Sequence, residues 1–150
     1  MYKRIAAGRA RKVFADLTAG DDAGVMKDMA DDVHHIFPGD NALGGERHSS
    51  DAFRRWLERL RRLFPELRIE VQRVAVKGPP WDMWIAVQWT DTGSAADRVP
   101  YQNRGAHWIR IRRGRAVRVQ AYLDTDRVTA SCKRMAAAGI EEAAAAPITD

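Results

Sequence analysis

The sequence contains a single cysteine, Cys132, among its 150 residues. One cysteine excludes a disulfide within the chain and fits a reducing compartment, so we expect a cytoplasmic protein. No stretch approaches the roughly 20 apolar residues that a membrane-spanning helix needs. The basic N-terminal stretch MYKRIAAGRARKVF also lacks the apolar region and cleavage site of a secretory signal. These absences favour a globular protein without a membrane partner.

Motifs for several common chemistries are missing as well. The sequence has no glycine-rich phosphate loop, nucleophile elbow or dinucleotide-binding fingerprint. Cysteines and acidic residues do not cluster at the spacing of metal ligands. The adjacent His34 and His35 point to opposite faces of a strand, so their side chains cannot bind one ion together. We therefore expect no metal and no cofactor.

Positive charge is abundant but not concentrated. Lys and Arg total 25 against 20 Asp and Glu, which gives a formal net charge of +5. The arginines are spread along the chain, which is typical of a solvated surface rather than of a nucleic-acid interface. Binding to nucleic acid is therefore a minor alternative. The helix FRRWLERLRRLF is basic and amphipathic, but a core helix shows the same pattern, so we do not expect it to bind a membrane.

Hydrophobic periodicity divides the chain into helices followed mainly by strands. Apolar residues at a spacing of three to four predict helices over about 5–18, 21–30, 49–64 and 124–138. Alternation predicts a short strand before Pro38 and four longer strands over 67–76, 83–92, 101–112 and 115–124. We expect NALGGERHSS to be a loop and residues 139–150 to be a frayed or partner-docked tail.

This order of elements predicts one domain over residues 1–150, with a core from about 5 to 138. Helices on one side of an antiparallel sheet define the α+β class. A long helix laid across a strongly curved sheet encloses space, and that space is the natural place for a ligand pocket.

Three segments and the order of elements resemble a known family. FPGDNALGG, SDAFRRWLERL and YQNRGAHWIRIRRGRAVRVQAYLDTD look like the SnoaL-like branch of the nuclear transport factor 2 superfamily, which includes ketosteroid isomerase, limonene epoxide hydrolase and polyketide cyclases. The resemblance covers about residues 5–138. It implies a cone, cystatin-like in fold, in which a curved antiparallel sheet wraps around the long helix. Because this fold hosts many chemistries, it does not by itself define an activity.

The last predicted strand ends at an acid that the resemblance makes the main catalytic candidate. It implies that the row Gln120, Tyr122 and Asp124 faces the pocket. SnoaL-like cyclases use the aspartate at this strand end as general acid/base, and that role falls on Asp124. A carboxylate in an apolar pocket gains basicity because desolvation disfavours its charged form. The alternative is that Asp124 caps the closing helix.

His107 is the second catalytic candidate. It shares a strand row with Tyr101 and Asn103, and antiparallel pairing brings this row within reach of an inward-facing Asp124. Its imidazole could then donate to a substrate oxygen or shuttle a proton near neutral pH. The alternative is a histidine that only hydrogen-bonds a neighbour such as Tyr122.

The functional residues of two other relatives do not transfer. The positions that match the base and the oxyanion donors of ketosteroid isomerase hold Phe37, Phe14 and His107. The Arg–Asp pair of the epoxide hydrolases matches Val87 and Trp89. We therefore expect neither activity.

Other aromatic and imidazole side chains complete the expected site and predict one interface. Trp89, whose row faces the cavity, either stacks on a ligand or packs in the core. The residues alone leave open whether His34 or His35 lines the pocket, and we name His34 because the resemblance places its row inward. Trp108 and Arg110 lie on the convex face of the sheet, where the resemblance implies a homodimer.

The expected function is proton transfer on a moderately apolar small molecule, such as a polyketide or terpenoid-like compound, by cyclase, isomerase or hydrolase chemistry. Asp124 moves the proton and His107 assists it. The expected ligand-binding residues are Tyr122, Asn103, Trp89, His34, Tyr101 and Gln120. The alternative is a non-catalytic ligand-binding or dimerisation module of the same fold.

Overall fold

A computed structural model describes residues 1–150 as helices packed on one six-stranded sheet. The strands are β1 (Met29–Phe37), β2 (Gly45–Arg47), β3 (Arg68–Lys77), β4 (Asp82–Ser94), β5 (Pro100–Arg112) and β6 (Arg115–Leu123). The helices are α1 (Tyr2–Ala19), α2 (Asp22–Met26), α3 (Ser50–Leu63), α4 (Thr125–Ala137) and the 3-10 helix η1 (Glu141–Ala144). The strand order is β2-β1-β6-β5-β4-β3.

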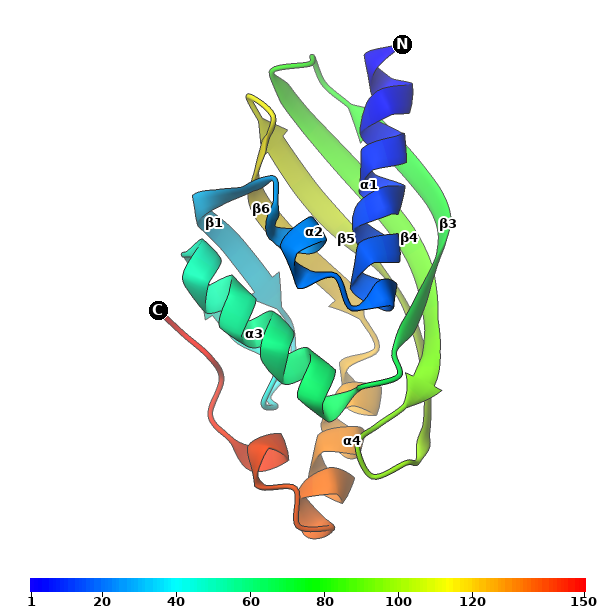
Figure 1. Cartoon of the computed structure of the whole chain (residues 1–150), viewed down its shortest axis with the longest axis vertical. Coiled ribbons are helices and arrows are strands. Elements are labelled where there is room, and N and C mark those ends of the chain that lie inside the picture. Colours follow the sequence, from blue (N-terminus) through cyan, green and yellow to red (C-terminus); the bar gives the residue numbers. More distant parts are fainter.

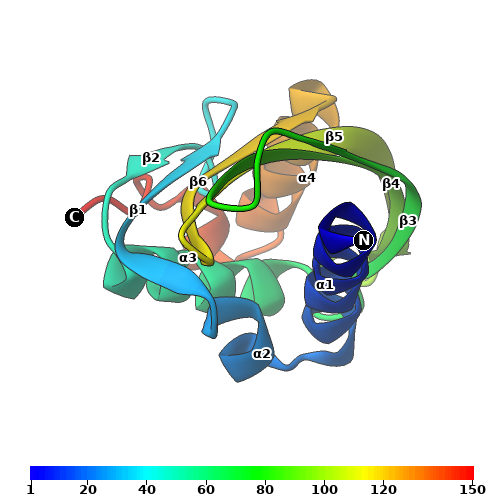
Figure 2. The ribbon, with the colours of Figure 1, turned by 90° about the horizontal axis from the view of Figure 1, so that it is seen from above.

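The sheet is strongly curved, and its concave face holds the helices (Figure 1). Figure 2 shows α1 inside the bend formed by β3 and β4, and α3 on the side of β1. The α+β class and the curved sheet are confirmed. None of the helices has the length and apolar character that crossing a bilayer requires.

Local sequence signals determine where several elements begin and end. Gly20 ends α1 with a φ of 81°, a conformation that glycine adopts without strain. The Ser49 side chain accepts a hydrogen bond from the backbone N–H of Ala52 at 3.1 Å and so caps α3. Arg113 and Gly114 both have positive φ, which fits the tight turn between β5 and β6.

The pairing of the first two strands differs from expectation. The run from β3 to β6 is an antiparallel meander as predicted, but β1 pairs in parallel with β6. β2 lies within NALGGERHSS, which we expected to be a loop, and pairs antiparallel with β1. A strand of three residues is too short to show alternation, which explains why the sequence pattern does not reveal it.

The register of the ladder assigns each side chain to one face of the sheet. Successive strand partners on β4, β5, β6, β1 and β2 form one inward-facing row: Ile85, Ile109, Val119, His35 and Arg47. The partners one position away form an outward-facing row: Trp84, Arg110, Arg118 and His34. Each row therefore brings together residues that are far apart in the sequence.

The expected orientation of β6 is wrong, because its apolar row faces inward. Ala121 is buried, whereas Tyr122 is 49% exposed. His107 pairs with Ala121, which puts Ala121 on the cavity face. Trp108 pairs with Gln120, so Gln120 and Tyr122 lie on the convex face with the exposed Trp108. Burial of the apolar side chains outweighs the orientation that the resemblance implied.

The C-terminal segment is docked on its own chain rather than frayed (Figure 1). Arginines of α3 and β2 donate hydrogen bonds to the backbone carbonyls of Ala146, Ile148 and Thr149. Arg47 is the fully buried member of this set. Its Nε donates to Ile148 O at 3.0 Å, its Nη2 donates to Gly44 O at 2.9 Å, and its Nη1 donates to Nδ1 of His35.

We expect Arg47→Ala to lower the free energy of unfolding by about 3 kcal/mol, because a buried and a half-buried carbonyl lose their donor and a cavity is left behind. Arg55→Ala is the matched control, since Arg55 also donates to the C-terminal segment but is exposed. Its loss should stay below about 1 kcal/mol. Urea unfolding measures both variants, and equal small losses would contradict the anchoring role of Arg47.

Candidate active site

A mostly apolar cavity of about 90 Å³ lies between the concave face of the sheet and helices α1 and α3. Of its 23 lining residues, 20 are hydrophobic. The three others are His35, Asp91 and His107, and the hydroxyl of Tyr101 adds a fourth polar group. A small number of polar groups in an apolar cavity is typical of a ligand site.

A second apolar cavity of about 250 Å³ adjoins the first beneath the N-terminal half of α1. The two cavities share the lining residues Val13, Val25, Met29 and Ile109. The first cavity alone has the volume of about three liquid water molecules. The second cavity therefore gives room to the apolar part of a larger ligand that reaches the polar groups.

Asp91 is the only carboxylate of the first cavity. It follows Ile85, Val87 and Trp89 on the inward row of β4, and it is 5% exposed. Its Oδ1 has no hydrogen-bond partner. Burial raises the pKa of Asp91 to about 6, although the backbone N–H of Asn103 opposes the shift. An unpaired carboxylate of this kind marks a functional-site candidate.

Our sequence reasoning missed Asp91, although a usable signal was present. In the stretch IAVQWTD, alternation places Asp91 on the same face as Trp89, which we had expected to face the cavity. Aspartate on a buried apolar row is rare unless it is paired. Asp91 therefore stands out once the row is assigned.

His107 lines the cavity as expected, and a hydrogen bond fixes its tautomer. Nε1 of Trp89 donates to Nδ1 of His107 at 2.8 Å, so the hydrogen of the neutral ring lies on Nε2. Burial lowers the pKa of His107 to about 4, which keeps the ring neutral at physiological pH. Gly105 leaves room for this arrangement, because a Cβ there would come within 3.0 Å of the Trp89 ring.

Tyr101 and Asn103 lie on the same inward row of β5, also as expected. Nδ2 of Asn103 donates to the hydroxyl oxygen of Tyr101 at 2.9 Å and to the backbone carbonyl of Asp124 at 2.9 Å. Burial, and then the charge of Asp91, raises the pKa of Tyr101, so its phenol stays protonated. Because its oxygen already accepts from Asn103, its hydrogen is free to be donated elsewhere.

His35 takes the inward position that we had assigned to His34. On β1, His35 pairs with Val119 of the inward row, so alternation turns His34 to the outer face. Nδ1 of His35 accepts from buried Arg47, and the ring lies edge-on to Phe53. Burial, and then the charge of Arg47, holds the pKa of His35 well below its ordinary value.

Asp124 does not face the cavity, so the expected orientation of its carboxylate is wrong. Its side chain is 50% exposed. Oδ1 accepts from the backbone N–H of Asp126 at 3.1 Å, and Oδ2 accepts from Nε of Arg127 at 3.3 Å. The alternative that Asp124 caps the closing helix is therefore confirmed. β6 ends one residue earlier, at Leu123, and the carboxylate turns toward the first turn of α4.

Asp91 and Asp124 are nevertheless connected through a polar hollow at the surface. Residues of β4, β5 and the start of α4 line this hollow of about 410 Å³: Thr90, Asp91, Thr92, Gln102, Asn103, Arg104, Asp124 and Arg127. Asp91 thus lies at the boundary between the apolar cavity and this polar hollow, which has no hydrophobic lining residue.

The pairing of β4 with β5 places Asp91 and His107 far apart along the sheet. Asp91 pairs with Asn103, Trp89 with Gly105, and Val87 with His107. Asp91 and His107 are therefore four positions apart, which is roughly 13 Å between backbones. A ligand that touches both must lie along Trp89.

Solved structures of the nuclear transport factor 2-like class share this architecture. One is a protein of unknown function from Burkholderia pseudomallei, with 22% identity, a TM-score of 0.71, and coverage of 80% of this chain and 91% of that chain. Another is a putative polyketide cyclase from Xanthomonas campestris, with 17% identity, a TM-score of 0.63, and coverage of 84% and 95%. A third is TerC, co-crystallised with polyporic acid, with 18% identity, a TM-score of 0.66, and coverage of 80% and 92%. At these identities the likeness establishes the fold alone.

The family follows from the sequence comparison. Residues 10–119 match the family model described as the SnoaL-like domain, and the chain belongs to that family. A comparison with curated proteins gave no significant match. The fold and the family that we expected are both confirmed.

The raised pKa of Asp91 predicts that ionisation of this group destabilises the native state. Its native pKa of about 6 exceeds the ordinary value of 3.8. The protonated side chain of Asp91 therefore contributes fully to the stability of the native state below pH 3.8. This contribution is lost as the pH rises through about 6 and the carboxylate forms. Asparagine does not ionise, so the free energy of unfolding of Asp91→Asn does not fall in this way. The difference in free energy of unfolding between the variant and the unmodified protein should therefore shift by roughly 2–3 kcal/mol in favour of the variant between pH 4 and pH 7. Urea unfolding at several pH values measures the difference, and a pH-independent difference would reject the assignment.

Proposed function

We propose that the protein is an enzyme that transfers protons on an apolar small molecule, with Asp91 as the acid/base group. The observation that carries this proposal is the buried carboxylate of Asp91, whose Oδ1 has no partner inside an apolar cavity. A base works best when its pKa lies near the operating pH, and a value of about 6 meets that condition.

The surrounding groups suit the removal of a proton from carbon. Asp91 accepts a proton from a carbon next to a carbonyl group, and the negative charge moves to the carbonyl oxygen. O–H of Tyr101, the diagonal neighbour of Asp91 on β5, then donates a hydrogen bond to that oxygen. Nε2–H of His107, roughly 13 Å further along the sheet, donates only where conjugation carries the charge to a more distant oxygen of the same molecule. Asp91 returns the proton to another atom of the same molecule, which completes an isomerisation or a ring closure. The proton is conserved, so these steps need no oxidant or reductant.

The cavities support an extended, moderately apolar substrate. The first cavity holds the polar groups but has a volume of only about 90 Å³, whereas the adjoining one offers about 250 Å³. Trp89 offers a flat surface between the acid and His107. Similarity to a putative polyketide cyclase and to TerC, co-crystallised with polyporic acid, favours a flat, conjugated, polyketide-like molecule. In this assignment Asp91 takes the role that we had expected for Asp124.

Hydrogen exchange at carbon tests the proposal and separates the two aspartates. Conjugated ketones that raise the melting temperature are incubated with the protein in D₂O, and mass spectrometry follows deuterium uptake. Asp91→Asn should lower the exchange rate by about 10²–10⁴-fold. Asp124→Asn should leave it within about twofold, since asparagine also caps a helix.

The outcomes of this experiment are distinct. Unchanged exchange in Asp91→Asn would reject Asp91 as the base, and loss of exchange in Asp124→Asn would restore the acid that we had expected from the sequence. Ligands that bind without any exchange would favour the alternative, a non-catalytic binding module of the same fold.

We also propose that the convex face of the sheet forms a homodimer in a reducing compartment such as the cytoplasm. Trp108 is 46% exposed and Tyr122 49% exposed on this face. Exposed aromatic side chains at the centre of a sheet are typical of protein interfaces. The single Cys132 is buried and unpaired, which fits the compartment.

Sedimentation should show a dimer at micromolar concentration that Trp108→Arg converts to monomer, because the charge removes apolar contact at the centre of the face. Trp81→Arg is the matched control. Trp81 is 67% exposed, but it precedes β4 and so lies outside the face. A monomeric unmodified protein, or equal effects of the two substitutions, would contradict this interface.

A further inference from the structure

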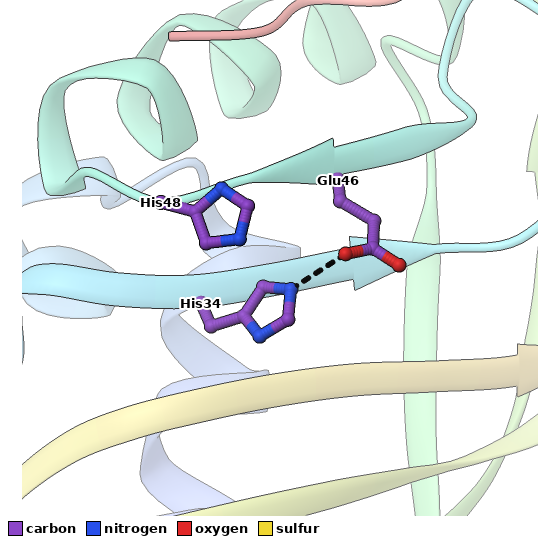
Figure 3. Close-up of side chains that lie close together, drawn as sticks. All are labelled: His34, Glu46 and His48. Carbon is purple, nitrogen blue, oxygen red and sulfur yellow. Dashed lines mark hydrogen bonds and ion pairs between the residues drawn. The ribbon is translucent and has the colours of Figure 1, made fainter.

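Three potential metal ligands meet on the outer face of the sheet at its β1–β2 edge. His34, Glu46 and His48 each offer one ligand atom, and these atoms all lie within 4.8 Å of one another. Figure 3 shows the His48 ring next to the His34 ring, and the Glu46 carboxylate joined to His34 by a dashed line. Nε2 of His34 lies 2.8 Å from Oε2 of Glu46, and the rings of His34 and His48 have centroids 4.3 Å apart. We call this set the edge cluster.

The strand ladder, rather than a loop, positions the edge cluster. β1 and β2 are antiparallel, with His35 opposite Arg47 and Ile36 opposite Glu46. Continued by one position, this register puts His48 opposite His34, while Glu46 is the diagonal neighbour of His34. Directly opposed side chains have Cβ atoms about 5 Å apart, and long side chains reach a diagonal neighbour. The backbone therefore holds the donors together in advance.

The edge cluster resolves the question raised by the adjacent histidines. His34 and His35 do point to opposite faces, so they do not share an ion. His34 instead meets Glu46 and His48, which lie twelve and fourteen positions further along the chain. The two other histidines, His35 and His107, line the internal cavity.

We propose that His34, Glu46 and His48 bind a zinc ion. Two imidazoles and one carboxylate form a donor set that zinc accepts with tetrahedral geometry, and the fourth position is left for water. The side chains of His34 and Glu46 are 26% and 54% exposed, so the ion reaches them without a change in fold. The ligand atoms lie within 4.8 Å of one another, whereas two donors at about 2.0–2.2 Å from one ion are at most about 4.4 Å apart, so binding needs a small rotation of the side chains.

One neighbouring residue opposes the ion. Nη1 of Arg118 donates to Nδ1 of His34 at 3.0 Å, so the hydrogen of the neutral ring lies on Nε2, where it faces Glu46. A zinc ion on Nε2 replaces that hydrogen and requires one on Nδ1, which Arg118 then repels. Arg118 therefore has to turn away before zinc binds, and its removal should strengthen binding.

Zinc at the edge cluster would also stabilise the edge of the sheet. β2 is the last strand of the sheet and contacts only β1 within it. The backbone N–H of His48 donates to Oδ1 of Asp150 at 2.7 Å, which links the cluster to the docked C-terminal segment. A ligand that binds only the native state raises its stability by mass action. We therefore expect zinc to raise the melting temperature.

Titration of the untagged protein with zinc chloride, followed by calorimetry and by NMR of ¹⁵N-labelled histidine, tests the proposal. We expect one zinc ion per chain and shifts of the His34 and His48 ring nitrogens, with those of His35 and His107 unchanged. His48→Ala and Glu46→Gln should each raise the Kd by at least the roughly 10–100-fold that loss of an outer-shell partner produces. Glu70→Gln, which removes an exposed carboxylate from β3, is the control and should leave the Kd unchanged.

Arg118→Gln gives a test in the opposite direction. It should lower the Kd, because glutamine can accept the hydrogen that a zinc-bound His34 carries on Nδ1. The absence of a heat of binding, ring shifts confined to other histidines, or weaker binding in Arg118→Gln would overturn the proposal. The internal cavity takes no part in this test, so its outcome is independent of proton transfer by Asp91.

Discussion

The register of the strand ladder is the constraint on which the candidate sites of this protein depend. Because side chains alternate between faces, a shift of one position would exchange the inner and outer rows completely. The observed register aligns His35 with Arg47 on the inside and leaves His34 outside. It likewise turns His107 inward and Trp108 outward. The cavity therefore lies on the concave face of the sheet, and the edge cluster lies on the opposite, convex face at the β1–β2 edge.

Alternation predicted the inner face of the sheet well where a strand is long. Alternation places Tyr101, Asn103 and His107 on one row of β5, while the expectation that this row faces the cavity rested on the resemblance and on an inward-facing Asp124. Trp89 does lie on the inward row of β4. Thirteen residues in each of these strands give the pattern enough length to be read. The convex position of Trp108 follows from the same reasoning.

The predictions of which side chains face inward were wrong on β1 and β6, where the resemblance was preferred to the alternation of apolar residues. On β1 the buried row is Val33, His35 and Phe37, but the resemblance favoured the row of His34 as the inner one. For β6 the apolar row was evident, but the resemblance favoured the polar row as the inner one, and burial decided otherwise. The arginine-held C-terminal segment could not be predicted, because its hydrogen bonds go to backbone carbonyls, which every sequence carries.

The two histidines of the cavity are hydrogen-bond donors and Asp91 is an acceptor, because neighbouring side chains determine which histidine nitrogen carries the hydrogen. Trp and Arg side chains are donors only, so Trp89 and Arg47 force Nδ1 of His107 and of His35 to accept. Each neutral ring therefore carries its hydrogen on Nε2 and acts as a donor. Asp91 is the acceptor among them. The cavity thus pairs one base with donors, which is the polarity that enolate formation requires.

The position of Asp91 explains why its pKa rises to about 6 and not further. Burial alone favours the protonated form, but the backbone N–H of Asn103 favours the carboxylate and offsets part of that effect. Asp91 also borders the polar hollow that reaches Asp124 at the surface, so in the proposed reaction protons would exchange with solvent on that side while a substrate would occupy the other. An apolar residue at this position would avoid the loss of stability that ionisation of Asp91 causes. An unpaired acid at the boundary between the apolar cavity and the polar hollow is therefore better explained by the proposed proton transfer than by folding.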